Sequence, residues 1–242
     1  MWIYIALGLT GGFVLLLCLC LAVANFSYEN FKEKYTNLDR YQNSNGITTL
    51  QYVKQINQNN FNSKIAIESC GQFQDCYYSG RVALSGQTMQ SNSLASLSIV
   101  SHELGHARQD FSGDTLKKHI SMRRAGRFCG MFFMPLMIVG AIMCLLFVFG
   151  VLPQKIVLYC GIVALALALI IFLFAIILKY KEIKIERQAS DFAVEFLAEI
   201  LTAGEVKMCK DFLDSARLTY WGGLFRTMFG WTFLTQKDKM FK

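Results

Sequence analysis

Three long apolar stretches set the pattern of this chain. Residues 1–28, 128–152 and 156–178 contain no Asp, Glu, Lys or Arg. A helix needs about 20 residues to cross about 30 Å of hydrocarbon, at about 1.5 Å per residue, and each stretch is long enough. Only Pro153-Gln154-Lys155 separates the second stretch from the third. The pattern therefore predicts three transmembrane helices, of which the last two form an antiparallel hairpin.

The polar part between the first two stretches predicts a small α+β unit. Apolar residues recur every three positions from Ile47 to Ile56, a spacing that favours a short helix. Lys64–Glu68 and Gly80–Ser85 have the composition of short strands, which we expect to pair as a β hairpin. Two strands are too few for a stable sheet, so the hairpin must pack on a helix. The natural partner is a helix that begins near Ser91–Ser93, where a serine can cap it.

The part that follows the third apolar stretch also predicts helices. From Ile185 onward the apolar residues follow helical spacing. Glu186 lies on one face of this helix together with three small residues, Ala189, Ser190 and Ala193. Small residues allow a second helix to approach the carboxylate closely. The later segment 218–234 is apolar and aromatic but contains Arg226, so we interpret it as interfacial or packed against the membrane helices and not as a fourth span.

The distribution of positive charge predicts the orientation in the membrane. Of the 24 Lys and Arg residues, 23 lie between the first two apolar stretches or after the third, and only Lys155 lies in the turn. The positive-inside rule then places the N-terminus outside and residues 29–127 and 179–242 in the cytoplasm. The net charge of +7 follows from this topology. Nucleic-acid binding is not expected, because the basic residues bracket apolar spans and do not form a separate patch.

A cleaved signal peptide is the alternative interpretation of the N-terminal stretch. Ala22-Val23-Ala24 fits the small-residue cleavage pattern. However, no Lys or Arg precedes the apolar run, and the run is longer than the usual apolar core of about 7–15 residues. A membrane helix is therefore the favoured interpretation.

His102-Glu103-Leu104-Gly105-His106 is the stretch with the clearest chemistry. Two histidines four positions apart project from nearly the same face of a helix, where both can bind one Zn²⁺ ion. Glu103 follows the first histidine directly and can take a proton from a water molecule at that ion. The alternative is an amphipathic helix with two solvated histidines. We expect His102 and His106 to be metal ligands and Glu103 to be the general base.

A catalytic zinc site normally has a third protein ligand. A third histidine six residues after His106 is absent, since that position is Ser112. His119 is next to Lys117-Lys118 and is expected to be an interfacial side chain. Glu186 is the better candidate because small residues flank it on a packed helix. A salt bridge remains the other explanation for Glu186, and Asp191 and Glu182 are the next candidates.

The chain resembles the YugP-type neutral zinc metallopeptidases, which are small bacterial membrane proteins. The matching elements are the N-terminal span, Ser44-Asn45-Gly46-Ile47-Thr48, the strand Gly80–Ser85, the motif at 102–109, the two-span hairpin, Ile185–Ser190 and Ala216–Tyr220. The resemblance implies one Zn²⁺ ion with His102, His106 and Glu186 as ligands, Glu103 as catalytic base, and a bacterial cell membrane location. The wider glutamate-zinc pattern has an aspartate four residues after the ligand. Here Ser190 holds that position and Asp191 follows, so either residue could orient a histidine.

We therefore expect a mainly α membrane protein with a small α+β metallopeptidase domain. Residues 1–28 form the first span, 29–127 the cytoplasmic catalytic part, 128–178 the hairpin, and 179–242 a cytoplasmic helical part that carries the third ligand. The expected function is a zinc-dependent endopeptidase that acts near the cytoplasmic membrane surface on peptides or membrane proteins. If the third span continues as one helix, Glu186 lies about 12 Å beyond the hydrocarbon edge.

Other functional interpretations remain open at this stage. A non-catalytic zinc-binding membrane scaffold or chaperone is the main alternative, although metal binding does not require Glu103. A zinc transporter is disfavoured because the apolar stretches contain no His, Asp or Glu. The strand Gly80–Ser85 could offer an edge on which a peptide binds as an added strand. Candidates for stabilising the oxyanion of the reaction are Tyr220, Arg217, Tyr77, Tyr78 and His119.

Overall fold

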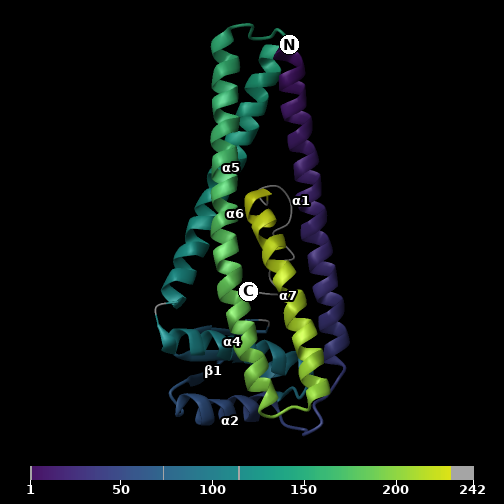
Figure 1. Ribbon diagram of the computed structural model, residues 1–242, viewed down its shortest axis with the longest axis vertical. Coiled ribbons are helices and arrows are strands. Elements are labelled where there is room, and N and C mark those ends of the chain that lie inside the picture. The colour runs from purple at the N-terminus through teal and green to yellow at the C-terminus, as the bar shows by residue number, and fades with distance from the viewer. Residues whose placement is uncertain (1, 73, 114, 230–242) are drawn as a thin grey trace. The chain divides into compact units, whose positions relative to one another are not determined.

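The computed structural model describes residues 2–72, 74–113 and 115–229, and this part of the chain is mainly helical. Its helices are α1 (Trp2–Asp39), α2 (Thr49–Phe61), α3 (Gly86–Gln90), α4 (Leu94–Ser112), α5 (Thr115–Val148), α6 (Lys155–Ala198) and α7 (Ala203–Phe229) (Figure 1). Its strands are β1 (Ala66–Cys70), β2 (Cys76–Tyr78) and β3 (Arg81–Ser85). These elements form two compact units. The apolar unit contains residues 2–26, 121–181 and 220–229, and the α+β unit contains 27–120 and 182–219.

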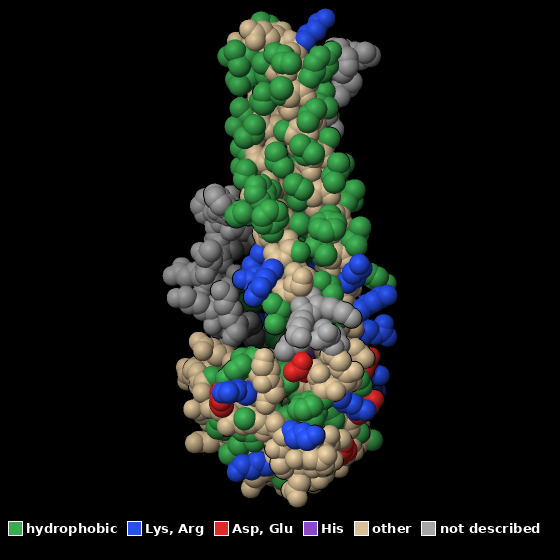
Figure 2. All heavy atoms as spheres, turned by 90° about the vertical axis from the view of Figure 1, so that its left-hand side faces the viewer, with side chains coloured by type: hydrophobic (Ala, Val, Ile, Leu, Met, Phe, Trp, Pro, Cys, Tyr) green, Lys and Arg blue, Asp and Glu red, His purple; other side chains and the backbone are tan. Residues whose placement is uncertain are grey.

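Two helical segments of the described chain, Ile120–Val148 and Lys155–Ala198, are long and apolar enough to cross a membrane. Figure 2 shows hydrophobic side chains over the surface of the apolar unit. Examples are Val139, Ile142, Val163 and Ile170, each with 49–62% of its surface exposed. Water-exposed apolar surface of this extent is unusual in soluble proteins and is typical of helices that contact lipid.

The expected third membrane helix, residues 1–28, is not among these segments. Helix α1 does cover this stretch, but it continues without a break through the charged residues to Asp39. Most side chains before Cys18 lie outside the described residues. The two segments above are therefore the candidate membrane spans that the described part of the structure supports. The C-terminal stretch 218–234 is helical as far as Phe229, as the end of α7, and its last residues lie outside the described part.

Helices α5 and α6 approach each other closely within the apolar unit. A Cβ atom added at Gly161 would lie 2.8 Å from the sulfur of Cys144 and 3.1 Å from the carbonyl oxygen of Gly140. A Cβ atom at Gly140 would lie 3.0 Å from the carbonyl oxygen of Gly161. Glycines at such contacts let helix backbones pack directly, which is common between membrane helices. This contact agrees with the expected hairpin of two apolar helices.

The sheet of the α+β unit differs from the expected hairpin. It has three strands in the order β1-β3-β2, with β1 parallel to β3 and β2 antiparallel to β3. The prediction of a direct hairpin between β1 and β3 was therefore wrong. The connection from 71 to 80 contains β2, which turns into β3 through Ser79 and Gly80, both with positive φ. Three residues are too few to show the alternation that identifies a strand in a sequence. As predicted, the sheet packs on the motif helix, since β2 and β3 contact α4.

The central position of β3 also changes the peptide-binding hypothesis. Both edges of β3 are paired, one with β1 and the other with β2. The strand at 80–85 therefore has no free edge for an added peptide strand, and that hypothesis was wrong. The edge strand that contacts α4 is β2.

Local sequence signals define the helices of the α+β unit. Thr48 caps α2 in a capping box with Gln51, in which each side chain accepts a hydrogen bond from the other residue's backbone N–H. Ser93 caps α4, and its side chain accepts a hydrogen bond from the N–H of Ser96. Helix α4 ends at Ser112, directly before Gly113. The predicted start of the motif helix near Ser91–Ser93 is confirmed.

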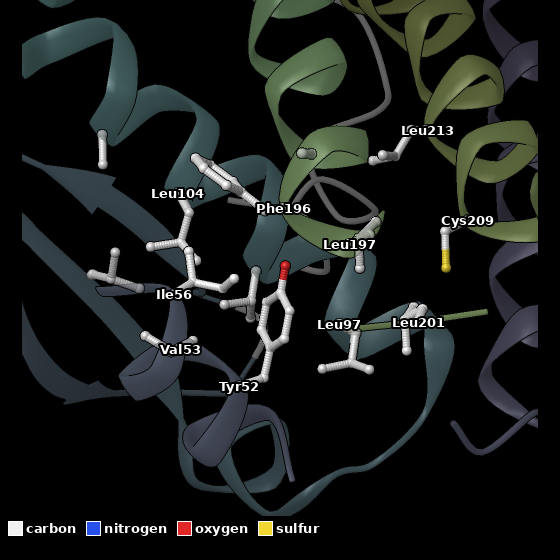
Figure 3. Close-up of a cluster of buried hydrophobic side chains, with 14 of the residues drawn as sticks. Tyr52, Val53, Ile56, Leu97, Leu104, Phe196, Leu197, Leu201, Cys209 and Leu213 are labelled. Atoms are coloured by element: carbon white, nitrogen blue, oxygen red, sulfur yellow. The ribbon is translucent and has the colours of Figure 1, made fainter. Parts of the chain in front are cut away.

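The core of the α+β unit holds α2, α4 and the second half of α6 together (Figure 3). Its largest fully buried side chains include Tyr52 from α2, Leu97 and Leu104 from α4, and Phe196 from α6. The Tyr52 hydroxyl lies 2.6 Å from the Ser101 hydroxyl, which itself donates to the carbonyl of Leu97. Tyr52 is therefore the donor to Ser101. These contacts fix the position of α4 relative to α6.

Candidate metal centre

Helices α4 and α6 come into backbone contact at Gly105. A Cβ atom added there would lie 2.2 Å from the carbonyl oxygen of Ala189, far inside van der Waals contact. Ala189 and Ala193 are completely buried on the same face of α6. The small residues predicted to surround Glu186 therefore do allow the close approach of a second helix. This approach brings side chains of the two helices within reach of one metal ion.

His102, His106 and Glu186 converge at this crossing. The Nε2 atom of His102 lies 3.1 Å from Oε2 of Glu186, and Nε2 of His106 lies 3.3 Å from the same oxygen. The potential ligand atoms of the three residues all lie within 4.8 Å of one another. Glu186 is 1% exposed, whereas both histidines are partly accessible. The three residues expected from the sequence are thus brought together, although 84 positions separate His102 from Glu186.

Ser190 sets the orientation of the His102 ring. Its hydroxyl donates a hydrogen bond to the carbonyl oxygen of Glu186 at 3.1 Å and lies 3.1 Å from Nδ1 of His102. Because the hydroxyl proton is already used, the oxygen accepts a hydrogen bond from Nδ1–H. Nε2 of His102, the atom that faces Glu186, is then the ring nitrogen left for a metal ion. Asp191 is exposed. Of the two alternatives left by the sequence, Ser190 is therefore the residue in contact with a histidine.

Gln109 plays the same part for His106, and sequence reasoning did not identify it. Its Nε2 group donates to the carbonyl of Ile185 at 2.7 Å and to Oε1 of Gln188 at 3.2 Å. The remaining atom, Oε1, lies 3.0 Å from Nδ1 of His106 and accepts its proton. Nε2 of His106 is consequently also the ring nitrogen left for a metal ion. The signal was present in the sequence, because a residue three positions after His106 lies beside it on the helix.

Glu103 lies beside the cluster and is held by strand β2. Its Oε2 atom accepts a hydrogen bond of 2.7 Å from the backbone N–H of Tyr77. Glu103 is only partly buried. The position agrees with the role of a base next to a metal site, because Glu103 directly follows His102 on α4 and its charge acts on His106.

Electrostatic interactions within the cluster affect the protonation of His106. Burial lowers the pKa of this imidazole, but the hydrogen bond and charge of Glu186, together with the charge of Glu103, outweigh burial and raise the pKa to about 9. In the metal-free protein His106 therefore carries a proton at neutral pH. A metal ion must displace this proton in order to bind.

The two separations that involve Glu186 suit a tetrahedral zinc ion. Ligand atoms about 2.0–2.1 Å from a tetrahedral ion lie about 3.3 Å from each other. The two separations of 3.1 and 3.3 Å between histidine nitrogens and the Glu186 oxygen match this value. Two imidazoles and one carboxylate form a donor set that is typical of catalytic zinc, which keeps the fourth position for water.

The match to a protein family agrees with this geometry. Residues 13–231 match the sequence model of a family described as "Putative neutral zinc metallopeptidase". The chain belongs to this family. No curated protein matches the chain, and no solved structure does. Membership in the zinc metallopeptidase family confirms the resemblance seen in the sequence, and the cluster of His102, His106 and Glu186 is where this family member can hold its metal.

The residues that the sequence suggested for stabilising the oxyanion have other interaction partners, where the structure describes their side chains. The Tyr77 hydroxyl donates to Asp110 at 2.7 Å and accepts from the N–H of Gly80. The exposed Tyr78 hydroxyl donates to Glu68, and Arg217 pairs with Asp214 one turn earlier on α7. The ring of Tyr220 faces the ammonium group of Lys179. The side chain of His119 lies outside the described residues.

Proposed function

We propose that this protein is a zinc-dependent membrane endopeptidase that hydrolyses peptide bonds. The observation that carries the proposal is the convergence of His102, His106 and Glu186, with Nε2 of both histidines directed to Glu186 and with Glu103 beside them. A purely structural zinc site uses all its ligand positions for protein groups and has no need of an adjacent carboxylate. Three potential ligands, together with a carboxylate that does not bind the metal, instead support hydrolytic chemistry.

The residues have separate roles in this proposal. His102, His106 and Glu186 hold the zinc ion, which when bound supplies Lewis acidity toward water and the scissile carbonyl. Glu103 accepts the proton of the attacking water and delivers it to the leaving amine. Ser190 and Gln109 keep the imidazoles in the orientation and tautomer that metal binding requires.

We further propose that the protein lies in the bacterial cell membrane with its site on the cytoplasmic side. The support is the distribution of Lys and Arg, which flank the apolar stretches within residues 29–127 and 179–242. Both of these parts must be on the same side for a shared site, because His102 belongs to one and Glu186 to the other. A reporter fused near residue 60 tests the orientation, and an external signal would contradict it.

The proposed substrates are peptides or membrane proteins close to the bilayer surface. A single helix, α6, contains both an apolar segment suited to the membrane and Glu186. A ligand on the continuation of a membrane helix favours substrates that are themselves held near the lipid.

The deciding experiment compares the wild type with Glu103→Gln. Both proteins are purified in detergent, their bound zinc is measured, and cleavage of a peptide library is followed by mass spectrometry. We expect equal zinc contents and loss of cleavage in the variant, because Glu103 is not a ligand. Glu195→Gln is the matched control, since Glu195 is an exposed glutamate of α6 that pairs with Arg108.

Two results would contradict the proposal. Equal cleavage by wild type and Glu103→Gln would remove Glu103 from the mechanism. A wild-type protein that binds zinc with the expected residues but cleaves no member of the library, in detergent or in lipid vesicles, would favour the non-catalytic scaffold.

A further inference from the structure

Tyr77 connects strand β2 to the motif helix at two points. Its backbone N–H donates to Glu103 at 2.7 Å, and its hydroxyl donates to Asp110 at 2.7 Å. Glu103 and Asp110 are seven positions apart on α4, which brings them within about 20° of the same helix face. The strand therefore follows the helix face on which the base lies.

The tyrosine hydroxyl also fixes the turn that follows β2. It accepts a hydrogen bond of 2.8 Å from the N–H of Gly80, which lies in the tight turn into β3 and has φ of +80°. The hydroxyl thus uses its proton for Asp110 and a lone pair for the turn. Tyr77 is only 7% exposed, and both burial and the bond to Asp110 raise the pKa of its hydroxyl, so it stays a proton donor.

This double attachment adds to the other contacts of β2, which are its pairing with β3 and the hydrogen bonds that the preceding residue, Asp75, accepts from Ser85 and Thr88. The strand has three residues and pairs with the sheet on one side only, through β3. A strand of this length at a sheet edge gains little order from pairing alone. The bond from Tyr77 to Asp110 is a side-chain attachment to α4 itself, and it helps to keep the N–H of Tyr77 in place against the carboxylate.

The same bond determines which oxygen of Glu103 is available. Oε2 accepts the N–H of Tyr77, and among the described residues no other group donates to this carboxylate. Oε1 therefore stays available for a water molecule. Without the N–H of Tyr77, the side chain would be free to rotate about its own bonds.

We propose that Tyr77 is a positioning residue for Glu103, acting through its hydroxyl contact with Asp110 and its backbone contact with the carboxylate. The inference rests on the proposed peptidase function, in which Glu103 is the base. A misplaced base is expected to slow the chemical step, while metal binding and substrate binding change little.

The test uses Tyr77→Phe, which keeps the buried ring and removes only the hydroxyl. With a peptide that the wild type cleaves, we expect kcat to fall by roughly 10- to 100-fold while KM and zinc content stay close to wild type. Tyr78→Phe is the matched control: it removes the hydroxyl of the adjacent, exposed tyrosine and should leave kcat unchanged.

Variants of Asp110 separate positioning from a loss of folding. Asp110→Ala should lower kcat in the same direction as Tyr77→Phe, which also loses the hydrogen bond from the N–H of Gly80. The double variant should show no loss beyond that of Tyr77→Phe, because the contact between Tyr77 and Asp110 is already broken in each single variant. Asp110→Asn keeps an acceptor oxygen for the tyrosine hydroxyl and should restore most of the activity. Equal losses for Asp110→Asn and Asp110→Ala, or loss of zinc in Tyr77→Phe, would overturn the positioning role.

A second measurement does not depend on catalysis. Amide hydrogen exchange of residues 76–80 should be faster in Tyr77→Phe than in the wild type and unchanged in Tyr78→Phe. Unchanged exchange together with wild-type kcat in Tyr77→Phe would overturn the inference. If the wild type bound zinc but cleaved nothing, the proposed function would fail. Hydrogen exchange would then still test whether the Tyr77 hydroxyl holds β2 in place: faster exchange in Tyr77→Phe would support this attachment, and unchanged exchange would refute it.

Discussion

Gly105 lies directly against the backbone of Ala189, so that a methyl group at position 105 would stand 2.2 Å from the Ala189 carbonyl oxygen. Both residues sit close to potential metal ligands of their helices. Gly105 lies between His102 and His106, and Ala189 lies between Glu186 and Ser190, which contacts His102. The distance between α4 and α6 therefore determines whether three ligands can share one ion.

Gly105→Ala should push the two helices apart. The added methyl meets backbone and not a movable side chain, so we expect a loss of about 1–3 kcal/mol of unfolding free energy and weaker zinc binding. Urea unfolding and zinc titration measure the two effects. Gly204→Ala is the control, because a Cβ atom at that helical position meets nothing within 4 Å. Wild-type zinc affinity in Gly105→Ala would contradict the importance of this contact.

Removal of the Glu186 carboxylate should strip the metal. A residue that binds the metal contributes more to zinc affinity than a residue that only hydrogen-bonds to a ligand. Loss of the second kind typically weakens binding by roughly 10- to 100-fold, so Glu186→Ala should weaken zinc binding by more than this. Zinc content after dialysis against a chelator provides the measurement, with the exposed Glu195→Ala as control. Unchanged zinc content would transfer the third-ligand role to Asp191 or Glu182.

Ser190→Ala should weaken zinc binding by roughly 10- to 100-fold, because His102 loses the acceptor that fixes its ring and tautomer. Asp191→Asn should have no such effect, since Asp191 is exposed. Competition with a fluorescent zinc chelator compares the two variants. The opposite order of affinities would mean that Asp191 supports the histidine after a local change in the helix.

Gln109→Ala should act in the same way on His106. The substitution removes the acceptor for Nδ1–H and also the donor to the carbonyl of Ile185 on α6. We expect roughly 10- to 100-fold weaker zinc binding, together with lower stability, because Gln109 is buried and its partners lose their hydrogen bonds. The chelator competition and a thermal unfolding scan measure the two effects. Normal zinc affinity would show that the His106 ring keeps its orientation without Gln109.

Zinc affinity should rise with pH. His106 has a pKa raised to about 9 in the metal-free protein, so at lower pH a proton competes with the metal. Between pH 6 and 8 the apparent dissociation constant should fall by up to about tenfold per pH unit. A zinc titration at three pH values checks this, and a flat profile would contradict it. The same raised pKa stabilises the metal-free fold at low pH, and this contribution is lost as the pH rises through about 9.

The sequence predicted the parts of this protein that depend on local pattern. Helical periodicity and a capping serine identified the motif helix α4, and the spacing of His102 and His106 placed two potential ligands on one face of it. Helical periodicity alone also predicted that Glu186 shares a helix face with small residues. Short-range rules suffice for these features because they arise within one helix.

Other features were not accessible from local pattern. Strand β2 was missed, and β1 was paired in the wrong direction, because strand pairing depends on contacts that the chain makes only after β2 has turned back at Gly80. The choice of Ser190 over Asp191, and the part played by Gln109, likewise depend on which side chains point across the α4–α6 contact.

The sequence by itself determined which residues can bind a metal and that their helices are amphipathic enough to pack. Only the tertiary structure decided that residues 84 positions apart meet within 3.1 Å, and which oxygen or amide orients each imidazole. The physical reason is that ligand identity is a property of single side chains. A metal site instead requires a distance and a direction between two helices, which are set here by the absence of a side chain at Gly105 and by the buried core beneath it.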